Sequence, residues 1–145
     1  MTTRSSFLEF LVVWSDADLQ EILITASSAS FAGQVNLYAG PDEISAFANL
    51  IHGFPASRDD KREFAFGQDG LSGYGTAHIS LMCKDSTGHI WITTTVRSSP
   101  IETNATAEAA TVVISATVAD IDRFETELRA LSGFADVNAK LLGST

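Results

Sequence analysis

The side chains best suited to covalent or metal chemistry lie close together in the middle of the chain, at His78, Cys83 and His89. Histidine and cysteine build zinc sites, and a histidine beside a cysteine activates the thiol as a nucleophile. Residues 76–84 alternate in the manner of a β-strand, so the odd separation of His78 and Cys83 places them on opposite faces. The spacing therefore favours neither a zinc site nor a Cys–His catalytic pair, and we expect Cys83 to be a small buried apolar residue.

Pairs of nearby carboxylates are the second candidate for chemistry, because they could transfer protons or bind divalent cations. Three such pairs are Asp42 and Glu43, Asp59 and Asp60, and Asp120 and Asp122. Two of them lie at the starts of predicted helices, where acidic side chains complement the helix dipole, and the third lies in a charged loop at 57–62. None supplies the several oxygen ligands that a calcium loop needs. The sequence thus predicts no catalytic residue, no metal, no cofactor and a protein that is not an enzyme.

The composition predicts one folded acidic domain spanning residues 1–145. Hydrophobic residues make up 45% of the chain and charged residues 19%, which is typical of a globular protein. The formal net charge of −9 argues against nucleic acid and anionic membranes as partners, because both attract clustered Lys and Arg. The apolar run at 7–14 is too short to cross a bilayer and no cleavage site follows it, so we expect a cytoplasmic protein.

Alternating apolar and polar residues predict about seven strands separated by turns and loops. The predicted strands are 7–14, 19–27, 31–38, 63–66, 76–84, 89–97 and 110–118. The clearest hairpin joins the fifth to the sixth, because the segment between them, Asp85-Ser86-Thr87-Gly88, has good turn chemistry. The chain after Gly133 carries no pattern that distinguishes a short last strand from irregular packing.

Two of these strands lead into amphipathic helices, and the two strand–helix units repeat each other. Ile44, Phe47 and Ile51 share one face of the first helix, as Ile121, Phe124 and Leu128 do at the same spacing in the second, at about 119–131. Thr117 and Asp120 have the spacing of a capping box at the start of the second helix. Because hairpins favour antiparallel pairing, we predict an α+β fold, a mostly antiparallel sheet of about seven strands with both helices packed on one face.

That arrangement leaves the other face of the sheet uncovered, and the sequence makes this face polar with embedded aromatic and basic residues. The predicted binding residues are Trp91, Thr93, Arg97, His78 and Tyr38, with Asp59 and Asp60 of the charged loop at the rim. Tyr38 joins the set if the third strand belongs to the same sheet. Trp, Tyr and Arg are enriched at binding hot spots, so we interpret the face as a partner surface. An ordinary solvated face is the alternative, because threonine is a good strand former.

Several structural residues follow one another in an order that is familiar. They are Phe31-Ala32-Gly33, Phe47, Gly53-Phe54-Pro55, Asp85 with Gly88-His89-Ile90, and Ile121 with Phe124 and Leu128. In these residues the chain resembles a group of small acidic bacterial proteins, most of them uncharacterised, and loosely the WapI-type immunity proteins of polymorphic toxin systems. The resemblance implies a cytosolic inhibitor that binds a cognate toxin. It identifies no active-site residue in this chain. Acidic charge suits such a role, since many toxin nucleases are basic and complementary charge speeds capture.

Three functional hypotheses follow. The first is a non-enzymatic protein-binding module, an immunity protein in the form that the resemblance implies, with a basic toxin domain as its partner. The second is a homo-oligomer whose sheet faces pack together in a structural role. The third is a small-ligand binder or enzyme with a pocket between sheet and helices, for which His89 and Asp85 are the polar groups.

Overall fold

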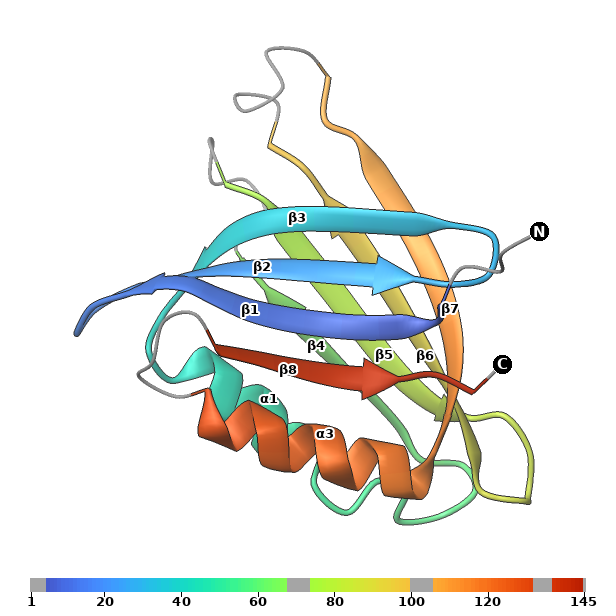
Figure 1. The fold of residues 1–145 in the computed structure, drawn as a ribbon. Helices are drawn as coiled ribbons and strands as arrows, with labels where there is room; N and C mark the ends of the chain where they lie inside the picture. The colour runs from blue at the N-terminus through green and yellow to red at the C-terminus, as the bar shows by residue number, and fades with distance from the viewer. Residues whose placement is uncertain (1–4, 68–73, 100–105, 132–136, 145) are drawn as a thin grey trace.

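In the computed structural model, which describes residues 5–67, 74–99, 106–131 and 137–144, the chain forms two antiparallel sheets of four strands and two helices (Figure 1). Sheet A has the strand order β3 (Ala32–Ala39), β2 (Gln20–Ser27), β1 (Phe7–Ser15), β8 (Val137–Leu142). Sheet B has the order β4 (Lys61–Phe66), β5 (Thr76–Cys83), β6 (His89–Arg97), β7 (Ala109–Thr117). The helices are α1 (Glu43–Ile51) and α3 (Val118–Ala130).

The prediction of an α+β fold with antiparallel strands is confirmed, but the prediction of one sheet of about seven strands is wrong. The seven predicted strands are all present, with ends within two residues of those expected, and β8 adds an eighth. They divide into two sheets that face each other, with the strands of sheet B running behind and across those of sheet A (Figure 1). Alternation along a strand determines which side is buried, but it does not determine which sheet the strand joins.

The helices do not cover the outside of a sheet, as the one-sheet prediction required. They lie side by side at one edge of the molecule (Figure 1), where α1 contacts β4, α3 contacts β8 and the two helices contact each other. They therefore close the gap between the β8 edge of sheet A and the β4 edge of sheet B. Each sheet keeps its outer face uncovered by a helix, so the molecule has two such faces instead of one.

The predicted repeat is present in the structure and extends over the whole fold. The first half runs β1-β2-β3-α1-β4 and the second runs β5-β6-β7-α3-β8. In each half three consecutive strands pair as neighbours, the helix follows, and the fourth strand joins the sheet of the other half. There β4 pairs with β5, and β8 pairs with β1, so each half contributes an edge strand to the other.

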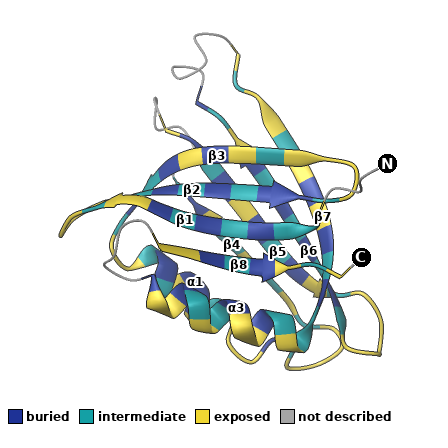
Figure 2. Ribbon diagram, viewed as in Figure 1, coloured by how far each residue is buried: buried dark blue, intermediate teal, exposed yellow. Residues whose placement is uncertain are grey.

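The core between the sheets is filled by apolar side chains from both halves, as the buried inner positions in Figure 2 show. Phe10 of β1 lies at the centre, stacked on Phe47 of α1 at 5.6 Å and edge-on to Phe66 of β4 at 5.2 Å and to Phe124 of α3 at 5.8 Å. The enclosed space found among these described core residues is about 10 Å³. That is about the space of a single water molecule, so this part of the interior has no room for a substrate.

The start of α3 is held by the capping box that the sequence predicts. The Thr117 hydroxyl accepts a hydrogen bond from the backbone N–H of Asp120, and the Asp120 carboxylate accepts one from the backbone N–H of Thr117. These reciprocal bonds satisfy donors that a helix leaves open at its N-terminus. The turn from β7 into α3 is therefore well defined, which places Phe124 over the core.

Candidate protein-binding surface

The outer face of sheet B is built as rows of side chains that the strand register places opposite one another. Trp91 on β6 lies between Met82 on β5 and Ser115 on β7. The next rows are Glu63, Ser80, Thr93 and Val113, then Ala65, His78, Thr95 and Thr111, then Thr76, Arg97 and Ala109. The side chains between them along each strand, such as Ile90 and Ile92, point into the core and are buried. Strict alternation therefore fixes which residues face outward.

The strands below these side chains are firmly paired. Both β5 and β6 are central strands with a partner on each side, and the Thr95 and Thr111 hydroxyls hydrogen bond across β6 and β7 at 2.9 Å. β-Branched threonines also have restricted side-chain rotamers. Side chains on this face are consequently pre-positioned, and a partner that binds here loses little conformational entropy in ordering them.

The outer face of sheet B is apolar around Trp91, toward the β5–β6 turn. Trp91 is half-buried, Met82 directly beside it on β5 is 44% exposed, and Val113, one row further along β7 and diagonal to it, is 46% exposed. The Lys84 ammonium lies 4.6 Å from the centre of the Trp91 ring, which is within the range of a cation–π contact. A tryptophan with a cation over its ring and an exposed apolar side chain beside it is the kind of group that buries well against a partner.

The charges on this face oppose the charge of the whole chain. Lys61, Lys84 and Arg97 project from it together with His78, and Glu63 is the carboxylate among them in the register rows. Glu63 lies 3.8 Å from both Lys61 and His78, but all three side chains are at least half exposed. Exposed ion pairs at that distance contribute little to stability and are easily exchanged for a partner's groups. The face is thus locally basic in a protein of net charge −9.

Four of the seven predicted binding residues lie together on this face, namely Trp91, Thr93, Arg97 and His78. Tyr38 lies elsewhere, because β3 belongs to sheet A and the condition for its inclusion fails. It occupies the outer side of sheet A, with its hydroxyl 3.5 Å from Glu21 and its ring edge-on to Tyr74 at 5.1 Å.

The two predicted rim residues differ in what they do. Asp60 accepts hydrogen bonds of 2.7 Å from the backbone N–H of Ala56 and from the guanidinium of Arg62. Those bonds, the one from Arg62 first, lower the pKa of the Asp60 carboxyl. Arg62 also donates to the carbonyl oxygens of Leu50 and His52 at the end of α1, so Asp60 helps hold a loop. Asp59 is exposed beside Lys61 and keeps its place at the rim.

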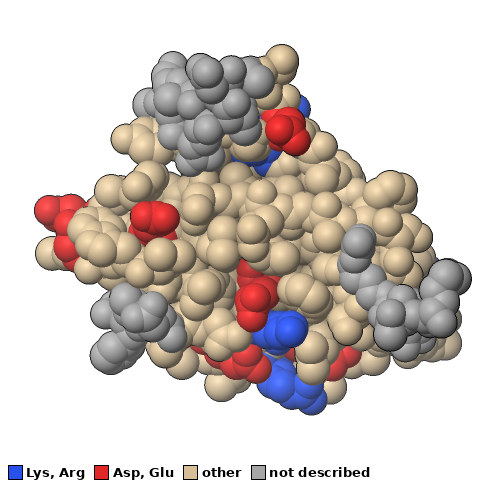
Figure 3. Space-filling model, turned by 45° about the horizontal axis from the view of Figure 1, so that its top comes forward, with Lys and Arg blue, Asp and Glu red and all other residues tan. Residues whose placement is uncertain are grey.

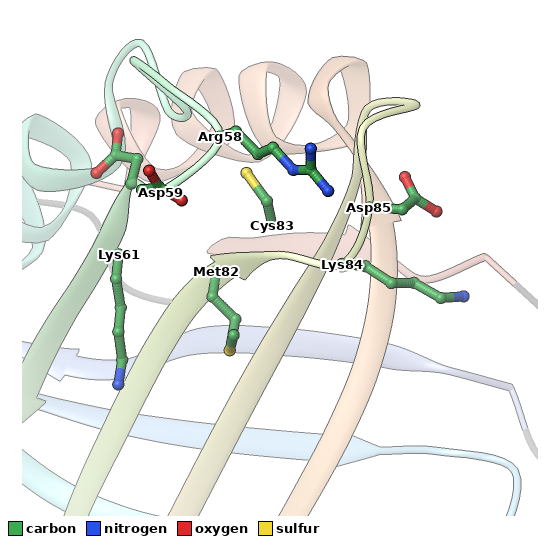
Figure 4. A pocket seen from close by; sticks show the side chains of 8 residues that line it. Arg58, Asp59, Lys61, Met82, Cys83, Lys84 and Asp85 are labelled. Carbon is green, nitrogen blue, oxygen red and sulfur yellow. The ribbon is translucent and has the colours of Figure 1, made fainter.

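A surface depression of about 360 Å³ lies between the loop before β4 and the end of β5 (Figure 4). It is lined by Arg58, Asp59, Asp60, Lys61, Met82, Cys83, Lys84 and Asp85. Positive and negative side chains alternate around it. In Figure 4 the Cys83 side chain points toward Arg58, and its sulfur lies 3.8 Å from the carbonyl oxygen of Ser57. Cys83 is partly buried against the core on the side of β5 opposite His78, as the odd spacing predicts.

Asp85 and His89, the polar pair of the small-ligand hypothesis, form part of the β5–β6 turn. The Asp85 carboxylate accepts hydrogen bonds from the hydroxyl and the backbone N–H of Thr87, which lower its pKa to about 2. His89 Nδ1 lies 3.4 Å from Asp85 and 2.8 Å from the Thr87 hydroxyl, and His89 is not among the residues that line the depression. The pair thus stabilises a turn. Among the described residues, no group of three or more His, Cys, Asp or Glu side chains is arranged to hold a metal ion.

Sequence reasoning missed a second set of exposed aromatic residues, at the far end of sheet A. Alternation along 7–14 places Trp14 inward with Phe10 and Val12, but it is 45% exposed. The register of β1 against β2 shifts between Val12 and Trp14, which marks a β-bulge. A bulge inserts one residue and reverses the side on which later side chains point. In the sequence, the only available signal is that Trp14 directly precedes the acidic turn Ser15-Asp16-Ala17-Asp18.

Comparison of the chain with protein-family models, with curated proteins and with solved structures gives no match. The resemblance to immunity proteins therefore stays a prediction. No helix within the described residues is both long enough and apolar enough to cross a membrane.

Proposed function

We propose that this chain is a protein-binding module whose contact surface is the outer face of sheet B, centred on Trp91. The observation that carries the proposal is the half-buried Trp91 with exposed Met82 beside it and exposed Val113 diagonal to it, on firmly paired strands. Large apolar side chains exposed together on a rigid sheet favour association, because a partner that covers them removes apolar area from water.

The basic side chains of this face indicate what the partner presents. Lys61 lies opposite Met82, Lys84 lies over the Trp91 ring, and Arg97 lies in the last register row at the other end of the face. These cations are best satisfied by carboxylates at the edge of an apolar patch. This differs from the basic partner that the net charge alone suggested, because the acidic residues lie mostly on other parts of the surface. The inhibitor hypothesis remains part of the proposal, in the form of a cytoplasmic module that covers an acidic and apolar patch of its target.

The same basic side chains argue against the homo-oligomer hypothesis in its face-to-face form. A two-fold contact between copies of this face would set two locally basic surfaces, each carrying Lys61, Lys84 and Arg97, against each other. Like charges opposed at short range are unfavourable. We expect the isolated chain to stay monomeric at high concentration in sedimentation equilibrium, and a dimer abolished by Trp91→Ala would favour self-association through this face instead.

The test begins with the full chain as bait in a lysate of the source cells, followed by measurement of the purified partner's affinity. Trp91→Ala should weaken binding by at least about tenfold, since buried tryptophans are frequent hot spots. Phe31→Ala is the matched control, because Phe31 is a 68% exposed aromatic residue at the β2–β3 turn. Binding should also weaken with rising salt. If folded Trp91→Ala binds as tightly as the Phe31→Ala control, the proposal for this face is wrong.

A further inference from the structure

The end of sheet A next to the β1–β2 turn gathers aromatic and acidic side chains that the proposed function does not use. After the bulge, Trp14 pairs with Glu21, and Glu21 pairs with Tyr38, so the three form one outward row. Tyr74, which is 43% exposed, packs its ring edge-on to Tyr38 with the ring centres 5.1 Å apart. Leu19, 38% exposed, follows the turn. Large apolar surfaces are thus exposed around one carboxylate.

A groove of about 210 Å³ opens beside Leu19, Tyr38 and Tyr74, with Trp14 and Glu21 outside its lining. It is lined by Leu19, Tyr38, Ala39, Gly40, Glu43, Gly67 and Tyr74. Its walls come from sheet A, from the start of α1 and from the end of β4, which are held together by the core. Small-molecule sites usually exceed about 300 Å³, so this groove suits a single side chain of a partner better than a whole metabolite.

The charge around the groove is negative. Glu43 lies in its wall, Glu21 lies 3.5 Å from the Tyr38 hydroxyl, and Asp16 and Asp18 lie in the adjoining turn. No ion pair among the described residues neutralises any of these four carboxylates. Figure 3 shows acidic side chains and no Lys or Arg at the end of the molecule where the β1–β2 turn projects.

We propose that this groove binds an arginine side chain presented by a partner protein. A guanidinium group is planar, so it can lie against the Tyr38 and Tyr74 rings while its N–H groups donate to Glu21 or Glu43. Charge complementarity favours a cation, the aromatic walls favour a flat and weakly hydrated one, and the small volume favours one side chain. The surface lies on a different sheet from the Trp91 face and carries the opposite charge, so the inference does not rest on the proposed function.

The test uses N-acetyl-arginine amide as the probe, titrated into the isotope-labelled full chain and followed by NMR. We expect shift changes at the amides of Leu19, Tyr38 and Tyr74 and at the Trp14 indole. N-acetyl-citrulline amide, which has the same shape without the charge, should produce much smaller changes. N-acetyl-lysine amide should bind more weakly than the arginine probe, because an ammonium group does not stack on a ring as a guanidinium does.

Variants then locate the binding to the groove. Glu21→Gln and Glu43→Gln keep a hydrogen-bond acceptor and remove the charge, and each should weaken arginine binding by about threefold or more. Asp122→Asn, an exposed carboxylate on α3, is the matched control and should leave binding unchanged. Equal losses in all three variants, shifts spread over every acidic part of the surface, or no shift at the groove at the highest soluble probe concentration would each overturn the proposal.

Discussion

Sheets A and B are formed by equivalent strands of the two halves, yet their outer faces differ in chemistry. On sheet A the cation Lys140 lies over the Phe7 ring at 4.3 Å, much as Lys84 lies over Trp91 on sheet B at 4.6 Å. On sheet A, however, apolar Leu11 and Leu23 pair at the centre, flanked by Asn36 and Asn138. The face of sheet B carries exposed Met82 and Val113 with several cations instead. Equivalent backbones thus present different surfaces.

The inner faces of the two halves are much more alike. When Phe47 is placed on Phe124, the inward residues of β3 fall on those of β7: Gly33 on Ala110, Val35 on Val112, Leu37 on Ile114 and Ala39 on Ala116. The two strands also have matching burial patterns. Side chains in a close-packed core are restricted in volume by their neighbours, whereas outward side chains are not. The inward residues are therefore those that the fold requires, and the outward residues are those that are free to suit a partner.

The largest expected effect tests whether the two halves contribute equally to the core. Phe47→Ala and Phe124→Ala should each lower the free energy of unfolding by about 3–5 kcal/mol, because each leaves a cavity beside Phe10. Urea denaturation measures both. Phe31→Ala, at an exposed turn, should change stability by no more than about 0.5 kcal/mol.

A large difference between Phe47→Ala and Phe124→Ala would show that the halves are not energetically equivalent. If either alanine variant fails to fold, Phe47→Leu and Phe124→Leu allow the same comparison with a smaller loss of side-chain volume.

The next largest effect concerns the point where the equivalent strands β3 and β7 approach each other closely. A Cβ atom added at Gly33 would lie 2.8 Å from the Cβ of Ala110, its equivalent in the second half, and 2.8 Å from Val96 Cγ2. Only one of the two equivalent positions therefore has room for a methyl group. Gly33→Ala should destabilise the protein by about 1–3 kcal/mol through overpacking.

The double variant Gly33→Ala with Ala110→Gly tests this explanation. It should recover part of the stability lost in Gly33→Ala, because it removes one of the two clashing atoms while Val96 remains. Urea denaturation of both single variants and the double variant gives the coupling energy. Strictly additive losses would mean that the close approach of the two strands is not what requires glycine at position 33.

The sequence predicted the elements and their repeat well because those depend on local patterns. The ends of β3 and α3, the capping box at Thr117 and the inward positions of both helices all follow from residue spacing. The placement of Trp91 and His78 on one face also followed, since both lie on one hairpin whose register its turn determines.

What could not be predicted depends on contacts between distant segments. The alternation along β3 is the same whichever sheet the strand joins. The sequence therefore could not show that Tyr38 lies on sheet A and not on the face that carries Trp91. β8 is a short edge strand with two exposed residues at its start, which leaves only a weak pattern to detect. The bulge before Trp14 depends on the pairing of β1 with β2. The charge of a face likewise emerges only when the register places Lys61, Lys84 and Arg97 on the same side of one sheet.

The smallest expected effect concerns the first hairpin turn of each half, which joins β1 to β2 and β5 to β6. Asp16 in the β1–β2 turn accepts hydrogen bonds from the backbone N–H groups of Asp18 and Leu19, and Asp85 in the β5–β6 turn accepts them from Thr87. Bonds from Thr87 lower the pKa of Asp85 from 3.8 to about 2 in the folded protein. A carboxyl with a lowered folded pKa stabilises the protein above its unfolded pKa, and this contribution is lost as pH falls. For Asp85 the loss should therefore occur between about pH 4 and pH 2.

Asp85→Asn removes the titrating group while keeping a side-chain oxygen that can accept from Thr87. Thermal unfolding measured from pH 6 to pH 2 should show a smaller fall in melting temperature for this variant than for the wild type. Asp59→Asn is the control, because Asp59 is an exposed carboxylate that should leave the acid dependence nearly unchanged. If Asp85→Asn and Asp59→Asn lose stability with acid in the same way as the wild type, the hydrogen bonds from Thr87 to Asp85 do not stabilise the fold, and this turn contributes no more than an ordinary solvated loop.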